Sequence, residues 1–194
     1  MKKLLAILAM MLSLAACDKL GKAPLKFENT DLTGLDYAKD FALTDHTGKA
    51  RTMADFKGKL VLIFFGYTQC PDVCPTTMAE MAAVMKELGP QADQLQVLFV
   101  TIDPERDTQA LLAQYVPAFD PRFLGLYGDA AATAKVAKEF KVFYAKSPGK
   151  TPGSYSMDHT AASYVFDRSG KIRLFVRHGN GPAPIVHDLK QLLN

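Results

Sequence analysis

Hydrophobic residues along this chain gather in two near-continuous runs separated by an amphipathic stretch. "KLVLIFFGY" (59–67) and "LQVLFVTID" (95–103) are apolar at almost every position, which is typical of strands buried on both faces of a sheet. Between them, apolar residues recur at helical spacing up to Leu88, and Gly89 and Pro90 then end the helix. The pattern therefore predicts a strand, a helix and a second strand at the centre of an α/β domain.

Weaker patterns on either side complete the order of elements. They predict a strand and turn (40–49), a helix (107–119), a short strand or loop (123–128), an Ala-rich helix capped by Asp129 (129–142), a hairpin around "DRSG" (161–179) and a last helix (183–193). This order is thioredoxin-like: an α/β fold with a mixed central sheet, helices on both faces and an N-terminal β-hairpin extension. We expect a tether over residues 17–36, with an early hairpin towards its end, and one domain over 37–194.

The N-terminus reads as an export signal. Lys2 and Lys3 precede a thirteen-residue, largely apolar run, Leu4 to Ala16, which is shorter than the ~20 residues that span a bilayer. The ending "LAAC" resembles a bacterial lipoprotein signal, which would be removed as residues 1–16 and would leave Cys17 lipidated. A plain signal peptide cut near Ala16 is the alternative. We expect an exported protein, held by its lipid at the periplasmic side of the inner membrane, as Asp18 also suggests.

Charge and cysteine content narrow the function. The 194-residue chain has a net charge of +3, and removal of Lys2 and Lys3 leaves +1 (3 − 2), so nothing indicates nucleic-acid binding. Cys70 and Cys74 are then the only cysteines of the domain. Export would place them in an oxidising compartment, where a disulfide staple, a redox couple and half of a metal site are all possible.

The stretch "CPDVCP" (70–75) lies just after the first buried strand, at the carboxyl end of the sheet, where α/β folds gather their sites. Because both cysteines precede proline, we expect Cys74 to be the N-cap of the following helix and Pro75 its first residue. A cysteine at the positive end of a helix would be stabilised as the thiolate. The methionines at positions 78, 81 and 85 could form a copper track, but their spacing favours an amphipathic core face.

Two thiolates need a third ligand to define a metal site. His46, His178 and His187 lie in a turn, a loop and a late helix, and we interpret them as surface or capping residues. His159, in "MDHTAASYVF", is expected at the start of a strand central or next to central in the sheet, close to the cysteine loop. Two thiolates with one imidazole suit Cu(I) and also accept Cu(II).

Three motifs in order, "FFGYTQCPDVCPTTM", "VTIDPERDT" and "MDHTAASYVFDRSGKI", resemble the Sco/SenC proteins, thioredoxin-like copper-binding factors for cytochrome c oxidase assembly. The resemblance runs from about Leu35 to the C-terminus. It implies one copper per chain, held by Cys70, Cys74 and His159, and delivery to the CuA centre of oxidase subunit II. It also implies exchange with other periplasmic copper chaperones or thiol reductants. Gln69 departs from the family, where many members have histidine.

Two structural roles remain open for each acidic residue near these motifs. Asp103 either orients a copper ligand or forms a turn, and Asp158 either orients His159 or begins a strand. Asp107 or Thr108 is expected to cap the next helix.

Three functions compete at this point. The first is a copper metallochaperone, which is not an enzyme. The second is a thiol–disulfide oxidoreductase that uses the Cys70/Cys74 pair, on oxidase subunit II or in redox signalling. The third, an inert disulfide, ranks last because it leaves the motif around His159 unexplained.

Overall fold

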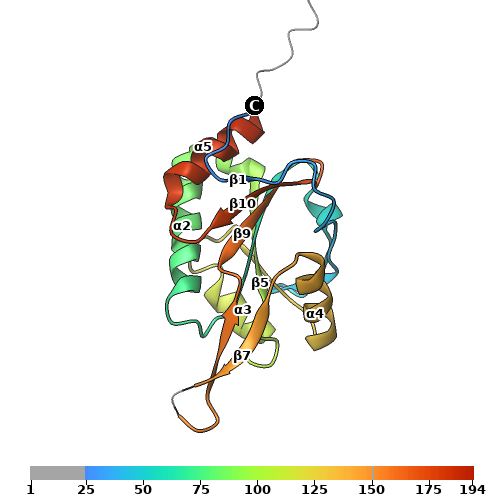
Figure 1. Cartoon of the computed structure of the whole chain (residues 1–194), viewed down its shortest axis with the longest axis vertical. Helices are drawn as coiled ribbons and strands as arrows, with labels where there is room; N and C mark the ends of the chain where they lie inside the picture. Colours follow the sequence, from blue (N-terminus) through green and yellow to red (C-terminus); the bar gives the residue numbers. More distant parts are fainter. Residues whose placement is uncertain (1–24, 150) are drawn as a thin grey trace, which may run out of the picture.

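The computed structural model describes residues 25–149 and 151–194 as one α/β domain. An eight-stranded sheet has the order β1-β10-β9-β4-β5-β6-β2-β3, and a two-stranded sheet pairs β7 with β8 (Figure 1). The predicted signal (1–16), Cys17 and the first part of the tether lie outside the described residues. The strands of the large sheet are β1 (Thr30–Asp31), β2 (Leu43–Asp45), β3 (Ala50–Arg51), β4 (Leu60–Gly66), β5 (Leu95–Thr101), β6 (Leu124–Tyr127), β9 (Ala162–Phe166) and β10 (Ile172–Arg177).

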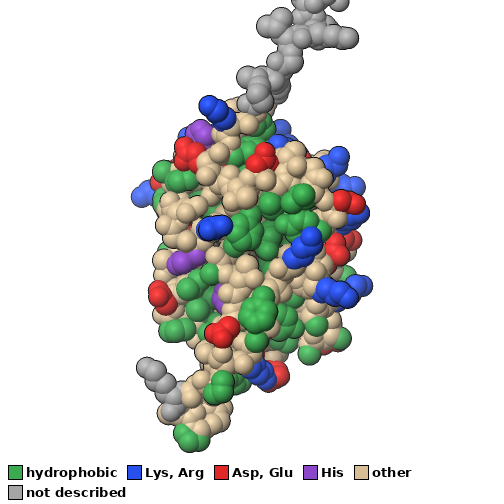
Figure 2. All heavy atoms as spheres, in the orientation of Figure 1, with side chains coloured by type: hydrophobic (Ala, Val, Ile, Leu, Met, Phe, Trp, Pro, Cys, Tyr) green, Lys and Arg blue, Asp and Glu red, His purple; other side chains and the backbone are tan. Residues whose placement is uncertain are grey.

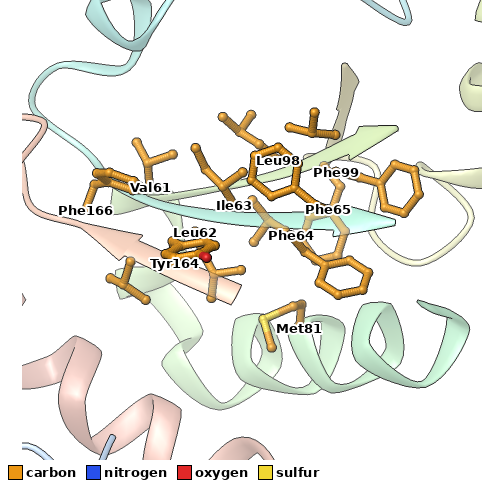
Figure 3. Packing of buried hydrophobic residues seen from close by; sticks show 14 of the residues in the cluster. Val61, Leu62, Ile63, Phe64, Phe65, Met81, Leu98, Phe99, Tyr164 and Phe166 are labelled. Carbon is orange, nitrogen blue, oxygen red and sulfur yellow. The ribbon is translucent and has the colours of Figure 1, made fainter. Parts of the chain in front are cut away.

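The two apolar runs form the centre of the sheet, as predicted. All residues of β4 are buried, and β4 pairs in parallel with β5 and antiparallel with β9. Successive side chains of a strand point to opposite faces, so Phe64 and Phe65 serve two different layers of the core (Figure 3). Phe64 lies on the side of Met81, which projects from α2 (Val73–Leu88), while the Phe65 ring lies 5.3 Å from that of Phe140.

Helices cover both faces of the sheet, as the predicted fold class requires. α2 packs beside α5 (Pro182–Leu193), and α4 (Ala130–Glu139) lies on the other side of the sheet (Figure 1). The Asp129 carboxylate caps α4 by accepting from the N–H of Ala132, as predicted. α3 (Gln109–Tyr115) is capped by Thr108, whose hydroxyl accepts from Leu111; this settles the choice between Asp107 and Thr108. Two 3₁₀ turns, Met53–Phe56 and Gly89–Gln94, precede β4 and β5.

The N-terminal hairpin consists of β2 and β3, and β2 joins the large sheet through β6. It lies later in the chain than expected. Within residues 25–36 the one strand is β1, which pairs with β10 across the chain rather than with a neighbouring segment. Non-local pairing of this kind leaves no turn signature between the two partners in the sequence. Among the described residues, no helix is both long and apolar enough to cross a membrane.

The expected start of α2 was wrong by two residues. The helix begins at Val73 with Asp72 as its N-cap, so Cys74 and Pro75 both lie in the first turn. Proline is tolerated there because the N–H groups of a first turn have no partner within the helix. The carbonyl with which Pro75 would clash belongs to Pro71, which lies outside the helix.

The expected location of His159 was also wrong in part. His159 ends β8 (Tyr155–His159), which pairs antiparallel with β7 (Tyr144–Pro148) in the small sheet. The central strand β9 begins only at Ala162. The motif "MDHTAASYVF" therefore spans two strands, and His159 occupies the junction between them.

Candidate metal centre

Three ligand atoms from distant parts of the chain converge at the carboxyl end of β4. The sulfurs of Cys70 and Cys74 and a ring nitrogen of His159 all lie within 4.8 Å of one another. Cys70 comes from the loop after β4, Cys74 from the first turn of α2, and His159 from the end of β8. Both cysteines are free thiols. Among the described residues, this is the one group of three or more histidine, cysteine or acidic side chains placed to hold a metal ion.

Cys74 lies in the hydrophobic core, whereas Cys70 is half-buried. The backbone N–H of Cys74 donates to the sulfur of Cys70 at 3.4 Å, which fixes the loop between the two thiols. Burial raises the pKa of the Cys74 thiol well above its usual value, because the thiolate would lose its hydration. The expected stabilisation of the Cys74 thiolate by the helix N-terminus is therefore not found in the metal-free protein, where burial raises the pKa of this thiol.

Gly66 makes room for the Cys74 sulfur. A Cβ at this position would lie 2.8 Å from the sulfur and 2.8 Å from the ring of Phe64. A glycine that ends a strand of bulky residues often marks such a close approach, so this signal was available in the sequence.

The imidazole of His159 is oriented with Nε2 towards the cysteines. Nε2 lies 3.6 Å from the sulfur of Cys74, and Nδ1 lies 3.1 Å from the carbonyl oxygen of Thr160. A carbonyl only accepts, so Nδ1 carries the proton and the lone pair of Nε2 is free to bind a metal. The rings of Phe64 and Tyr67 lie edge-on to the imidazole at 6.0 and 6.1 Å. Burial lowers the pKa of His159, which keeps the imidazole neutral.

Asp107 ties the cysteine loop to the neighbouring strand. Its buried carboxylate accepts from the Thr68 N–H at 3.0 Å, from the Thr68 hydroxyl at 2.6 Å and from the Thr101 hydroxyl at 2.6 Å. Thr68 lies two residues before Cys70, and Thr101 ends β5. Asp107 therefore links the loop that follows β4 to the carboxyl end of β5.

Neither acidic residue considered for ligand orientation contacts a ligand directly. Asp103 is buried and forms an ion pair with Nε of Arg106, and it also accepts a hydrogen bond from the Tyr155 hydroxyl at 2.9 Å. Its backbone carbonyl accepts from the N–H groups of Arg106 and Asp107, so the turn-forming role is present as well. Asp158 is exposed and accepts from the Ser147 hydroxyl on β7, and the partner of His159 Nδ1 is instead the Thr160 carbonyl.

The other histidines have partners away from this centre. His46 accepts from the Gly125 N–H through Nδ1, His178 contacts the Thr77 hydroxyl at 2.9 Å, and His187 contacts Asp188 at 2.8 Å. Histidine side chains reach the surface at several points of the face shown in Figure 2. The methionines of α2 form a core face rather than a track, since those at 78, 81 and 85 are all buried.

Sequence reasoning missed Tyr67 and Arg106. Tyr67 packs against His159, and its pKa is raised first by burial, with the nearby cysteines adding to the rise. Arg106 lies in a motif that was interpreted only through its acidic residues. The contact of Tyr67 with His159 and that of Arg106 with Tyr155 each join segments far apart in the sequence. No local pattern predicts such contacts.

A thioredoxin-like domain with two thiols and an imidazole at the carboxyl edge of its sheet is a candidate soft-metal protein. The SCO1/SenC family model matches residues 29–194, and the chain belongs to this family.

Curated relatives and solved structures point to the same family as the family model. The chain is 43% identical over 133 residues to the mitochondrial SCO2 homologue of Bos taurus, which covers 68% of this chain and 50% of the relative. It thus spans about half the length of the curated mitochondrial relatives it matches. Bradyrhizobium japonicum ScoI, solved with copper bound, is 45% identical with a TM-score of 0.73, over 79% of this chain and 97% of that one. Apo Sco1 of Thermus thermophilus is 39% identical with a TM-score of 0.77, over 88% and 99%.

Proposed function

We propose that this protein binds one copper ion through Cys70, Cys74 and His159 and serves as a metallochaperone in the assembly of cytochrome c oxidase. The observation that carries the proposal is the convergence of these three ligand atoms within 4.8 Å. Thiolates and imidazole form a soft donor set that suits copper. The copper in Bradyrhizobium ScoI supports the choice of metal. The CuA centre of oxidase subunit II as recipient follows from the resemblance to Sco/SenC proteins.

The cellular setting is part of the same proposal. We infer that residues 1–16 are removed on export and that a lipid on Cys17 holds the protein at the periplasmic side of the inner membrane. The short apolar run and the "LAAC" ending support this. The copper donor would then be another periplasmic chaperone.

The direct test is an anaerobic Cu(I) titration of the purified protein against a competing chelator. We expect one tightly held copper, and we expect His159→Ala to weaken its binding by about 100-fold. Loss of a residue that only orients a metal ligand can cost that much, and loss of the ligand itself should cost at least as much. His187→Gln is the matched control, since His187 is half-exposed and its ring contacts Glu28 and Asp188 rather than the cysteines. Equal affinity in His159→Ala and in the wild type would refute the three-ligand site.

A thiol–disulfide reductase is the second candidate, because both cysteines are free thiols whose sulfurs are close together. This function needs the two cysteines but not His159. A measured reduction potential of the Cys70/Cys74 pair higher than that of the disulfide in oxidase subunit II would exclude it. Deletion of the gene separates the two functions, because added copper should restore oxidase activity only if delivery is the limiting step.

A further inference from the structure

The segment that carries His159 is not part of the large sheet. We call β7 and β8 together (Tyr144–Pro148 and Tyr155–His159) the histidine arm. Its strands pair with each other from Tyr144↔His159 to Pro148↔Tyr155, and it projects from the lower end of the domain in Figure 1. No ladder of the large sheet therefore sets the distance between the arm and the cysteine loop. Other contacts must do so.

Arg106 contacts both the histidine arm and the cysteine loop. Its Nη1 donates to the backbone carbonyl of Tyr155 at 2.9 Å, and also to Oε1 of Gln69 at 3.3 Å. Tyr155 begins the strand that ends in His159, and Gln69 directly precedes Cys70. One guanidinium thus joins the two segments that supply the ligands.

The same guanidinium is held in place from two further directions. Its Nε forms an ion pair with the buried Asp103, which also accepts from the Tyr155 hydroxyl at 2.9 Å. The guanidinium carbon lies 3.7 Å from the centre of the Tyr155 ring, a cation–π geometry. Arginine suits this position because its planar group donates at its edge while its face stacks on an aromatic ring, which the compact ammonium of lysine cannot do.

Two further contacts also join the arm to the cysteine segment: the Tyr67 ring packs edge-on to His159 at 6.1 Å, and His159 Nε2 lies 3.6 Å from the Cys74 sulfur. Neither is a hydrogen bond from a charged group, which is the stronger kind. The other contacts of the arm are weaker or do not reach the cysteine loop. The ion pair between Lys146 and Glu105 is exposed on both sides, and such pairs contribute little to stability. Met157 packs in the core, and the Thr160 N–H donates to the carbonyl of Phe143 at the base of the arm. These contacts attach the arm to the domain, but they do not connect it with Gln69 and Cys70.

One end of the Arg106 guanidinium is buried at a cost. Nη2 is buried and has no hydrogen-bond partner among the described residues, and an unsatisfied buried donor is unfavourable. A cation that served only to stabilise the turn at 103–107 could lie at the surface. We propose that Arg106 is a positioning residue that holds the histidine arm against the cysteine loop, so that His159 reaches the two thiols. Its part in copper binding rests on the proposed function, whereas its hold on the arm does not.

The experiment compares Arg106→Gln with Arg122→Gln, a control that removes a half-exposed arginine whose partners are Asp120 and Asp93. In the metal-free protein, we expect backbone amides of the histidine arm to exchange about tenfold faster in Arg106→Gln, since three hydrogen bonds donated by the guanidinium are lost. We expect Cu(I) affinity to fall about tenfold, as is usual for groups behind a metal ligand. Arg122→Gln should change neither quantity.

A double mutant separates positioning from general stability. If Arg106 acts through His159, then Arg106→Gln should not weaken Cu(I) binding further in a His159→Ala background. Equal weakening in both backgrounds, or arm exchange unchanged in a folded Arg106→Gln, would overturn the proposal. If Arg106→Gln does not fold, Tyr155→Phe removes one hydroxyl contact of the same network, and arm exchange should rise about threefold; unchanged exchange there would overturn the proposal.

The two proposals fail in different ways. If the wild type held no copper, the proposed function would fail, and amide exchange of the metal-free arm would still decide the role of Arg106. If the wild type bound copper through His159 and Arg106→Gln matched it in both measurements, only the positioning role would fail.

Discussion

Replacement of Gly66 by alanine tests whether the Cys74 sulfur is held by close packing. The added methyl group would lie 2.8 Å from the sulfur, 2.8 Å from the ring of Phe64 and 3.0 Å from the ring of Phe99. Cys74, Phe64 and Phe99 are all fully buried, so no group around the added methyl has free space. Restoring an ordinary contact distance to the sulfur requires a displacement of roughly 0.7 Å.

The magnitude follows from this overpacking. Extra methyl groups in filled cores cost about 1–3 kcal/mol, and three close neighbours place Gly66→Ala near 2 kcal/mol, or about 6 °C in Tm for a domain of this size. Because metal sites tolerate displacements of only about 0.5 Å, Cu(I) affinity should fall about tenfold.

Thermal unfolding and Cu(I) competition measure the two effects. The control is the same substitution in a Cys74→Ala background, where the sulfur is absent and the methyl group meets only the two rings. We expect Gly66→Ala to cost at least about 1 kcal/mol less there, which is a coupling typical of residues in contact. An equal cost in both backgrounds would show that Gly66 is needed by the aromatic core alone.

Two predictions concern buried carboxylates, and urea unfolding measures both. Asp107→Ala leaves three donors of Thr68 and Thr101 without an acceptor and should cost about 3 kcal/mol. Asp107→Asn should cost less than half of that, because burial raises the pKa of Asp107 and already disfavours its charge; equal costs would contradict this reasoning. Burial alone would raise the pKa of Asp45, but hydrogen bonds, including one from Arg51, lower it to about 2 from an ordinary 3.8. Asp45 should thus contribute about 2 kcal/mol above pH 4, lost as the pH falls towards 2, and the stability gap to Asp45→Asn should close over that range. A gap that stays constant would refute the assignment.

The centre of the fold was predictable because its signals are local. Apolar residues at nearly every position of 59–67 and 95–103 leave buried strands as the fitting interpretation, and β4 and β5 are those strands. The capping of α4 by Asp129 was equally local. The convergence of the three ligand residues was expected from the predicted position of His159 near the cysteine loop and from the motif resemblance.

The errors lie where distant segments meet. The segment around His159 contains no glycine or proline to mark the break between β8 and β9, so His159 was assigned to the start of the central strand. The network of Arg106 with Tyr155 and Gln69 depends on three separate segments. The high pKa of the Cys74 thiol depends on burial, and the helix terminus alone pointed the other way.

The unequal burial of the two thiols bears on how the site would work. Attack on a disulfide requires an accessible thiolate, and Cys74 is fully buried with a raised pKa. Cys70 is the half-exposed member of the pair. Its sulfur is therefore the one that a partner protein would contact first, whether that partner donates copper or reduces a disulfide with its own dithiol. A metal cation offsets the cost of a buried thiolate. The thiolate of Cys74 is therefore stabilised when copper binds, and the protonated thiol is favoured in its absence. This burial favours metal binding over unassisted thiol chemistry at the inner position of the site.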